Sequence, residues 1–327
     1  MNLPTGLSLV PRLRFANLPT AIEPLPRLSA ALGGPHLLVK RDDLTGLAFG
    51  GNKTRKLEFV LAEAQANGAR TLVTVGAAQS NHCRQTAALA ARLGLDCILV
   101  LSGEAPAVPG GNLLLDHLFG AEIIWSTPAN RAAALQTAFD EAWQAGRRPY
   151  LIPLGASSAI GSLAYTAAFD EFLSQDVPAD WIVMASCSGG TQAGLVLGAQ
   201  QSGWQGHVLG ISIEEDEHDL KETVAFLASE AAERIGQRRR IRPDEVRVNA
   251  DYLGAGYGVM GAAEQEAIRL FARYEGLLLD PVYTARAAAG MIDLIRQKFF
   301  TPTETVLFWH TGGTPALFAD TYAANLL

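Results

Sequence analysis

The sequence is poor in the residues that build disulfide frameworks and metal centres. Among its 327 residues it has only three cysteines, Cys83, Cys97 and Cys187, and no CxxC pair. Its six histidines are scattered without the spacing of metal ligands. An odd, sparse set of cysteines is typical of a reducing compartment rather than of a disulfide-stapled secreted domain. We therefore expect a cytoplasmic protein without a structural metal site.

Long apolar runs and an excess of positive charge are also missing. No stretch reaches the ~18 consecutive apolar residues that a membrane helix needs. The N-terminal MNLPTGLSLVPRLRF contains two prolines but not the apolar segment of a signal peptide. The net charge is −7, which disfavours nucleic acids and anionic membranes as partners. A small-molecule partner is the expectation that remains.

Strands and helices alternate along the chain. Short apolar runs predict strands at 71–76, 96–101, 121–125, 150–153, 181–186, 207–213 and 305–310. Helices are predicted at about 81–93, 112–119, 128–145, 191–200, 216–236, 259–275 and 284–298. This alternation predicts an α/β protein with mainly parallel, twisted sheets flanked by helices. The length of the chain is typical of two domains.

Three glycine-bearing segments follow predicted strands, where ligands of parallel sheets bind. They are GAAQSNH (76–82), SCSGGTQAG (186–194) and HTGGTPA (310–316). The least regular connection is SGEAPAVPGGN (102–112), which we expect to be an exposed loop.

The segment FGGNKTRKLE (49–58) carries three cations in four positions. After Lys53 the apolar residues recur at helical spacing, from Leu57 to Ala64, and form one stripe. Arg55 and Lys56 lie off that stripe, so we expect them to face solvent or to pair with acids. Lys53 is different, because a helix N-terminus disfavours a nearby cation and a lysine there needs a reason.

A phosphate would be one reason for this lysine. The stretch from Gly46 to Thr54 nearly matches the P-loop pattern GxxxxGK[ST] of NTPases. However, Asn52 adds a residue before the lysine, and the upstream Asp42 and Asp43 would repel nucleotide phosphates. A P-loop NTPase is therefore the alternative from another functional class.

A covalent bond to a carbonyl compound would be the other reason. A lysine amine can condense with an aldehyde, especially when burial or neighbouring cations lower its pKa. Such a lysine together with a separate phosphate loop describes a pyridoxal-phosphate (PLP) enzyme. The turn Ser188, Gly189, Gly190 and Thr191 opens a helix after an apolar strand, and its backbone N–H groups suit a phosphate.

Six ordered segments resemble one family. They are KRDDLTGLAFGGNKTRKLEF, GAAQSNHCRQTAA, SGGTQAG, GYG, LLLDPVYTARAAAGM and HTGGTPALF. They resemble the D-cysteine desulfhydrase and 1-aminocyclopropane-1-carboxylate (ACC) deaminase family, which belongs to the tryptophan-synthase-β-like group of PLP enzymes (fold type II). The resemblance runs from about residue 8 to the C-terminus. It implies a homodimer whose subunits hold PLP between a large domain (1–53 plus 171–327) and a small domain (54–170).

The resemblance also implies roles for individual residues. Lys53 would be the lysine that bonds to PLP, and Asn81 would hydrogen-bond the 3′-oxygen of the cofactor. Other implied cofactor contacts are Ser188, Gly189, Gly190 and Thr191 at the phosphate, with Thr284 and Thr311. Implied substrate contacts are Gln79, Ser80, Asn81, His82, Tyr283, Thr311 and Gly312. Ser80, Tyr257 and Tyr283 would join Lys53 as catalytic residues.

Ordinary structural roles are the competing interpretation of several of these residues. Ser80 is a good N-cap, and His82 fits a helix surface or core. Tyr257 and Tyr283 fit buried aromatics with satisfied hydroxyls. Cys83 and Cys187 are expected to pack as small hydrophobic residues, and His310 to be structural.

Two positions separate the reactions of the family. ACC deaminases carry glutamate after the tyrosine of DPVY and leucine after the histidine of HxGG, whereas this sequence has Thr284 and Thr311. This pattern favours β-elimination from D-cysteine, giving pyruvate, hydrogen sulfide and ammonia. Lys53 would abstract the Cα proton, and Tyr283 or Tyr257 would protonate the leaving group.

Three alternatives remain within the same fold. One is ACC deaminase, and a second is L-cysteate sulfo-lyase, whose lysine and HTGG signatures this sequence shares. A sulfonate would call for an extra cation, and the motifs show none. The third is a non-catalytic PLP-fold binding protein. The 102–112 loop is also shorter than expected for the family, which bears on the choice of substrate.

Overall fold

The strands form two separate sheets in the computed structural model, which describes residues 6–326. The larger sheet has the order β1 (Ile22–Pro24), β2 (His36–Lys40), β10 (Thr305–Trp309), β7 (Trp181–Ser186), β8 (His207–Ser212) and β9 (Arg247–Asn249). The smaller has the order β5 (Glu122–Ser126), β4 (Asp96–Ser102), β3 (Thr71–Ala77) and β6 (Pro149–Leu151). All neighbouring strands in these sheets are parallel except β1 and β2. The predicted α/β fold with mainly parallel sheets is confirmed.

The central strands are apolar along their length because helices cover both faces. All six residues of β7, WIVMAS, are buried, as are six of the seven residues of β3. Uninterrupted apolar runs of this kind are expected where a parallel strand lies between two helical layers. These runs made the strands easy to predict.

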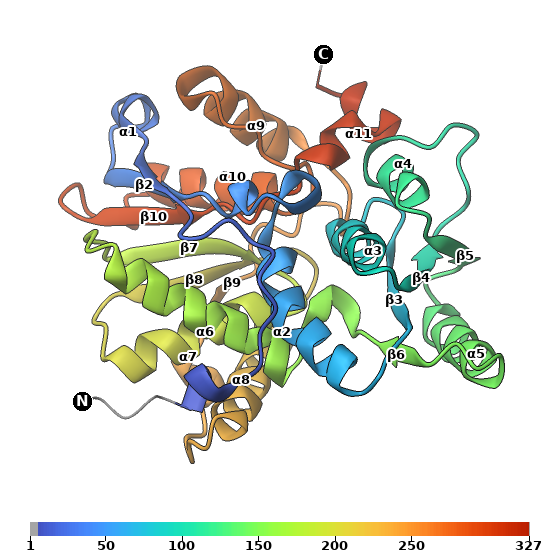
Figure 1. Cartoon of the computed structure of the whole chain (residues 1–327). Helices are drawn as coiled ribbons and strands as arrows, with labels where there is room; N and C mark the ends of the chain where they lie inside the picture. Colours follow the sequence, from blue (N-terminus) through green and yellow to red (C-terminus); the bar gives the residue numbers. More distant parts are fainter. Residues whose placement is uncertain (1–5, 327) are drawn as a thin grey trace.

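The helices divide between the two sheets (Figure 1). Around the larger sheet lie α1 (Pro26–Leu32), α6 (Ala159–Ser174), α7 (Gly190–Ser202), α8 (Glu217–Arg234), α9 (Ala262–Glu275) and α10 (Thr284–Arg296). With the smaller sheet lie α3 (Asn81–Leu93), α4 (Gly111–Leu118) and α5 (Arg131–Gln144). Helix α2 (Asn52–Ala66) runs between the two sheets and packs on α6, and α11 (Asp320–Ala323) is near the C-terminus. No helix of the described residues is long and apolar enough to cross a membrane.

The seven predicted strands, the seven helices predicted by their ranges and the helix predicted after Lys53 all exist, with ends that differ by a few residues. Helix α6 was not predicted. Its sequence AIGSLAYTAAFDEFLS is apolar on most sides and lacks a stripe with helical period, because the helix is buried against α2, α7 and α8. The strands β1 and β9 have only three residues each, too few to show a period.

The predicted domain division remains a prediction. All four strands of the smaller sheet lie within 54–170, and all six strands of the larger sheet lie outside it. Helices α2 and α6, at the two ends of that segment, pack against each other. The chain therefore crosses from one sheet to the other through a pair of contacting helices.

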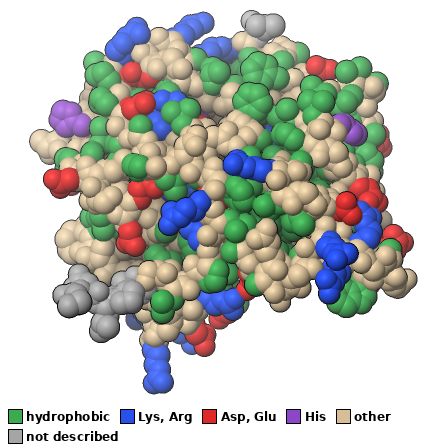
Figure 2. All heavy atoms as spheres, viewed as in Figure 1, with side chains coloured by type: hydrophobic (Ala, Val, Ile, Leu, Met, Phe, Trp, Pro, Cys, Tyr) green, Lys and Arg blue, Asp and Glu red, His purple; other side chains and the backbone are tan. Residues whose placement is uncertain are grey.

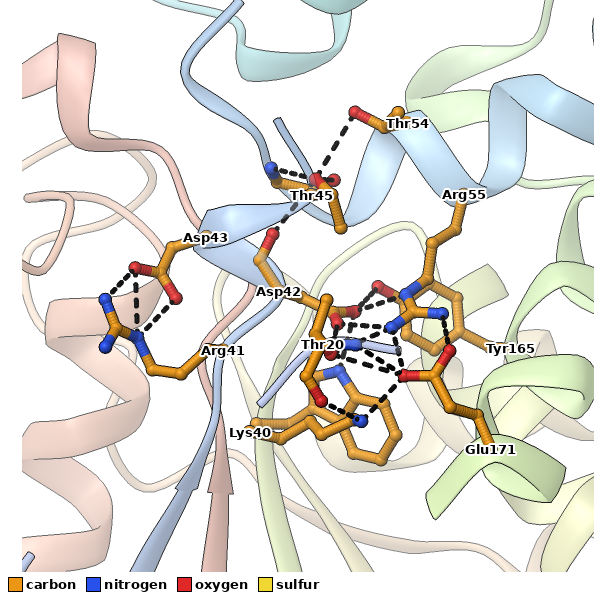
Figure 3. A network of polar contacts seen from close by, with 12 residues as sticks. Thr20, Lys40, Arg41, Asp42, Asp43, Thr45, Thr54, Arg55, Tyr165 and Glu171 are labelled. Carbon is orange, nitrogen blue, oxygen red and sulfur yellow. Dashed lines mark hydrogen bonds and ion pairs between the residues drawn. The ribbon is translucent and has the colours of Figure 1, made fainter. Parts of the chain in front are cut away.

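A buried ionic network joins α2 and α6 to the N-terminal segment (Figure 3). Arg55 is 1% exposed; its Nη2 lies 2.8 Å from Asp42 Oδ1 and its Nη1 2.9 Å from Glu171 Oε2. Lys40 Nζ lies 2.7 Å from Glu171 Oε1. Burial works to raise the pKa of Glu171, but the bonds and charges of Arg55 and Lys40 lower it to about 2. Arg55 pairs with acids as expected, but the alternative of a solvent-facing side chain is wrong.

Candidate active site

The three glycine-bearing segments meet at one cavity between the sheets. The cavity has about 870 Å³ of space that protein atoms do not fill, including the part open to solvent. Its lining includes Lys53, Ser80, Asn81, His82, Ser188, Gly189, Thr191, Tyr257, Tyr283, Thr311 and Gly312. Most of these residues come from the carboxyl ends of β3, β7 and β10 and from the start of α2, as expected for parallel sheets. Tyr257 and Tyr283 instead come from the segments before α9 and α10. Gln79, Gly190 and Thr284 are absent from the lining.

Lys53 is the second residue of α2, and the loop before it approaches the HTGG segment closely. Gly51 has φ 121°, and a Cβ there would lie 2.6 Å from Gln85 Nε2 and 3.1 Å from the carbonyl oxygen of Thr311. The backbone N–H of Asn52 donates to that same carbonyl at 3.0 Å. Only glycine fits this position, which explains the glycine before the lysine.

The amine of Lys53 is held where it can react. Its Nζ donates to Asn52 Oδ1 at 3.1 Å and makes no salt bridge with a described residue. Burial lowers the pKa of Lys53 to about 8, although Cys187 and Asp280 act in the opposite direction. A lysine with a lowered pKa has more of the free amine that condenses with an aldehyde.

Lys56, one helical turn later, was not predicted to take part. It is fully buried, and its Nζ donates to the carbonyl of Gly155 and to Ser157 Oγ, both at 2.8 Å. Burial and then the charge of Lys53 lower its pKa well below the ordinary value. The expectation that Lys56 is solvated or ion-paired is wrong, because the i, i+3 spacing turns it to the same side of the helix as Lys53.

The loop after β7 forms an anion cradle next to Lys56. Gly189 adopts φ 74°, and Gly190 and Thr191 open α7. Ser157 Oγ bonds Ser188 Oγ at 2.7 Å and accepts from the Gly190 N–H at 3.3 Å, so it links Lys56 to the loop. A helix N-terminus, a glycine turn and a nearby lysine amine together suit a phosphate group. These residues and Lys53 fit a PLP molecule.

The QSNH segment opens α3. Ser80 is its N-cap and accepts from the Cys83 N–H at 3.1 Å, as its sequence position predicted. The Gln79 side chain turns away from the cavity and bonds the carbonyl of Gly110 and the N–H of Asn112, at 3.0 and 2.8 Å.

His82, the second residue of α3, is buried, and its Nε2 bonds Thr74 Oγ1 at 2.8 Å. Burial, then the charges of Lys53 and Lys56, hold the pKa of His82 well below its usual value, so its imidazole is neutral.

Tyr257 and Tyr283 form a pair in the cavity. Their hydroxyl oxygens are 2.5 Å apart, and their rings meet edge to face with centroids 5.9 Å apart. Burial raises the pKa of both phenols, so each keeps its proton at neutral pH. The structure thus brings two proton-carrying hydroxyls to the cavity that Lys53 lines.

Thr284 faces a buried carboxylate instead of the cavity. Its hydroxyl donates to Asp280 Oδ1 at 2.8 Å, and the same carboxylate accepts the backbone N–H groups of Val282, Tyr283 and Thr284. Asp280 therefore anchors the start of α10. Of the two threonines that distinguish this sequence from ACC deaminases, Thr284 and Thr311, only Thr311 lines the cavity.

The lining also contains residues that were not predicted as site residues, among them Arg131, Cys187 and Glu214. Cys187 Sγ lies 3.7 Å from Glu214 Oε2, and burial raises the pKa of this thiol to about 12. Cys187 is partly buried and packs against the core of the larger sheet, and Cys83 is fully buried, so both cysteines pack as small hydrophobic residues as expected. Arg131 is the first residue of α5, and its position in sequence gave no sign of a site.

Comparisons with known proteins agree with this geometry. The family described as pyridoxal-phosphate dependent enzyme matches residues 13–312. The D-cysteine desulfhydrase of Salmonella typhimurium is 43% identical over 322 residues, which is 96% of this chain and 97% of that protein. The D-cysteine desulfhydrase of Salmonella typhi shows the same identity and coverage.

Solved structures show the same relationship. The crystal structure of an ACC deaminase homologue superposes with a TM-score of 0.90 at 37% identity, covering 99% of this chain and 98% of that one. A fungal L-serine ammonia-lyase from Rhizomucor miehei, at 20% identity and a TM-score of 0.66, shares the fold, with 94% of this chain and 96% of that one covered. Because these matches show a PLP-dependent family, the P-loop NTPase alternative is wrong. The chain belongs to the family of PLP-dependent enzymes, in the group that contains D-cysteine desulfhydrases and the ACC deaminase homologue.

Proposed function

We propose that the protein is a PLP-dependent lyase that eliminates hydrogen sulfide from D-cysteine. The observation that carries this proposal is the placement of Lys53 and the Tyr257–Tyr283 pair around one cavity. A β-elimination needs a base at Cα and a proton source at the leaving group, and these residues supply both. The full-length similarity to D-cysteine desulfhydrases supports the choice of substrate.

The residues of the cavity divide between cofactor and substrate. Lys53 would hold PLP covalently, the Ser188–Thr191 turn with Lys56 nearby would hold its phosphate, and Asn81 would meet its 3′-oxygen. When bound, PLP supplies an electron sink that stabilises negative charge at Cα of an amino acid. Ser80 at the start of α3 would offer donors to the substrate carboxylate.

The chain's own groups would then move two protons. The free amine of Lys53 takes the proton from Cα, which its lowered pKa permits near neutral pH. The Cβ–S bond breaks, and the departing sulfur receives a proton from the Tyr257–Tyr283 pair. Hydrolysis of the remaining three-carbon product gives pyruvate and ammonia, so D-cysteine and water become pyruvate, hydrogen sulfide and ammonia.

One observation favours L-cysteate as a second candidate substrate. The motifs offered no cation for a sulfonate, but the structure places Arg131 in the cavity lining, and none of the described carboxylates forms a salt bridge with it. Glu214 lines the same cavity and would repel a sulfonate. ACC is disfavoured because Thr284 and Thr311 stand where ACC deaminases have glutamate and leucine.

A product assay over a panel of amino acids tests the proposal. Purified protein with PLP is given D-cysteine, L-cysteine, L-cysteate, D-serine, β-chloro-D-alanine and ACC, and 2-oxo acid release is measured. We expect pyruvate and sulfide from D-cysteine with the highest kcat/KM. Sulfite from L-cysteate alone would favour the second candidate, and 2-oxobutyrate from ACC alone would overturn the threonine argument. A PLP-binding protein without turnover on any of these would indicate a non-catalytic role.

We also propose a cytoplasmic homodimer. All three cysteines are free, which suits a reducing compartment. Large apolar side chains are exposed on α4 and on the adjacent 3₁₀ helix η6 (Thr314–Phe318): Leu114 is 42% exposed, Leu118 71% and Phe318 66%. Figure 2 shows hydrophobic side chains at the surface in this region. Sedimentation velocity should give a dimer, and Leu118→Glu should shift it toward monomer; a monomeric wild type would contradict the proposal.

A further inference from the structure

Arg84 is a buried arginine of α3 behind the cavity wall. It is 0% exposed, yet it forms no salt bridge with any carboxylate of the described residues. Its Nη1 donates to Asn81 Oδ1 at 3.1 Å and to Asn112 Oδ1 at 2.7 Å, and its Nη2 donates to the Gly50 carbonyl at 2.7 Å. Burying a guanidinium on neutral acceptors alone is unfavourable, so its retention calls for a reason other than stability.

The arginine determines which way two amides point. A guanidinium has donors only, so the atoms of Asn81 and Asn112 that face it are oxygens. The Nδ2 of Asn112 is thereby turned to Asn81 Oδ1 and to the Gln79 carbonyl, each at 2.8 Å. Asn81 Oδ1 therefore accepts two bonds from behind the wall. The Nδ2 of Asn81 is left as the donor for the cavity that this residue lines.

The same guanidinium reaches the loop that carries Lys53. It shares the Gly50 carbonyl with Gln85, whose Nε2 donates to that oxygen at 2.9 Å. Gln85 is itself fixed, because its Oε1 accepts from Thr54 Oγ1 at 2.7 Å. If Arg84 were replaced, the Gly50 carbonyl would keep the fixed Gln85 donor. Asn81 Oδ1 would keep only the Asn112 amide, which would itself have lost the Arg84 bond that sets its orientation.

We propose that Arg84 is a positioning residue, which with Asn112 orients the Asn81 amide so that its Nδ2 donates to the cofactor. The inference rests on the proposed place of Asn81 at PLP. It also explains why Gln79 turns away from the cavity, since Gln79 holds the start of α4 and thereby Asn112. The end of the short 102–112 loop is in this way connected to the cofactor site.

A double-mutant cycle in PLP affinity tests the inference without using any substrate. PLP is titrated into PLP-depleted full-length protein and its visible absorbance is followed, for wild type, Asn81→Ala, Arg84→Gln and the double variant. We expect each single change to weaken PLP binding about tenfold. In the Asn81→Ala background, Arg84→Gln should weaken it at most about threefold further, because its effect passes through Asn81.

The control is Arg92→Gln, an exposed arginine in the last turn of the same helix, which should leave PLP affinity unchanged. An equal loss of about tenfold from Arg84→Gln in both backgrounds would overturn the inference while leaving Asn81 at the cofactor. Unchanged PLP affinity in Asn81→Ala would overturn both assignments. If Arg84→Gln does not fold, Asn112→Ala takes its place in the cycle, and the same outcomes decide.

Discussion

At the residue scale, the molecule buries charged groups where neighbours compensate for them unevenly. Arg55 has two carboxylates at hydrogen-bond distance, whereas Asp116 on α4 is 0% exposed and neither of its oxygens has a hydrogen-bond partner in the described structure. Burial raises the pKa of Asp116 to about 8, with the charge of Arg84 acting against it. We therefore expect replacement of Asp116 to stabilise the protein and replacement of Arg55 to destabilise it.

Replacing Asp116 by Asn should stabilise the protein, and more so as pH rises. The folded pKa of about 8 lies above the ordinary 3.8, so the folded protein keeps a proton that the unfolded chain releases. The contribution of this group to the free energy of unfolding is therefore greatest at low pH and falls up to about pH 8. Urea unfolding of both proteins should show a difference that grows between pH 4 and 8 and then levels off. A difference independent of pH would contradict this.

Replacing Arg55 by Met should destabilise the fold by about 3–5 kcal/mol, because Asp42 and Glu171 would lose their main counter-charge inside the protein. Arg296→Met is the matched control. Its pair with Glu266 is half exposed, so we expect a loss of at most about 1 kcal/mol. Denaturant unfolding measures the free energy of unfolding of both variants. Equal losses would show that burial does not make the Arg55 ion pairs more important for stability than the exposed Arg296 pair.

At the element scale, the junction between the GGN loop and α2 determines where Lys53 lies. Gly51→Ala would place a Cβ against Gln85 Nε2 and the Thr311 carbonyl at a φ of 121°. The loop would have to shift, and a displacement of about 1 Å at a reacting group lowers turnover by about 100-fold. Gly94→Ala at the end of α3 is the control, since it has φ 68° but no atom within 4 Å of the added Cβ.

The readouts for these two glycine variants are PLP occupancy, kcat and melting temperature. We expect Gly51→Ala to lose occupancy and kcat, and Gly94→Ala to lose only stability, because its strain lies away from the cavity. Full activity in Gly51→Ala would mean that the approach of the HTGG segment does not position the lysine.

The elements also show what a sequence can reveal. Strands such as β7 were predictable because a buried parallel strand is an apolar run, and Ser80 was predictable as an N-cap because its hydroxyl satisfies a free N–H. Lys56 was not, because off-stripe cations are usually solvated and only the packing of α2 against the 155–157 segment buries it. Arg131 lines the cavity because the tertiary structure brings the start of α5 there, and the local sequence around Arg131 does not indicate this position.

At the scale of the whole molecule, two sheets joined through α2 and α6 place the carboxyl ends of three strands around one cavity. The fold and most of the site segments were predictable, because each segment combines a strand end with a glycine turn. The partners of Gln79 and Thr284 were not, since both side chains bond to neighbouring loops behind the cavity wall. The cavity therefore depends on a supporting layer that only the three-dimensional structure reveals.

Two lysines with lowered pKa lie in or beside this cavity, and the proposed mechanism requires that Lys53, and not Lys56, bonds to PLP. Lys53 lines the cavity and has one amide oxygen as a partner, whereas the Lys56 amine is held by Gly155 and Ser157. The direct measurement is borohydride reduction of the purified protein with PLP, followed by peptide mass spectrometry. We predict the pyridoxyl group on Lys53 in the wild type and no labelled lysine in Lys53→Ala. A pyridoxyl group on Lys56 in the wild type would contradict the assignment.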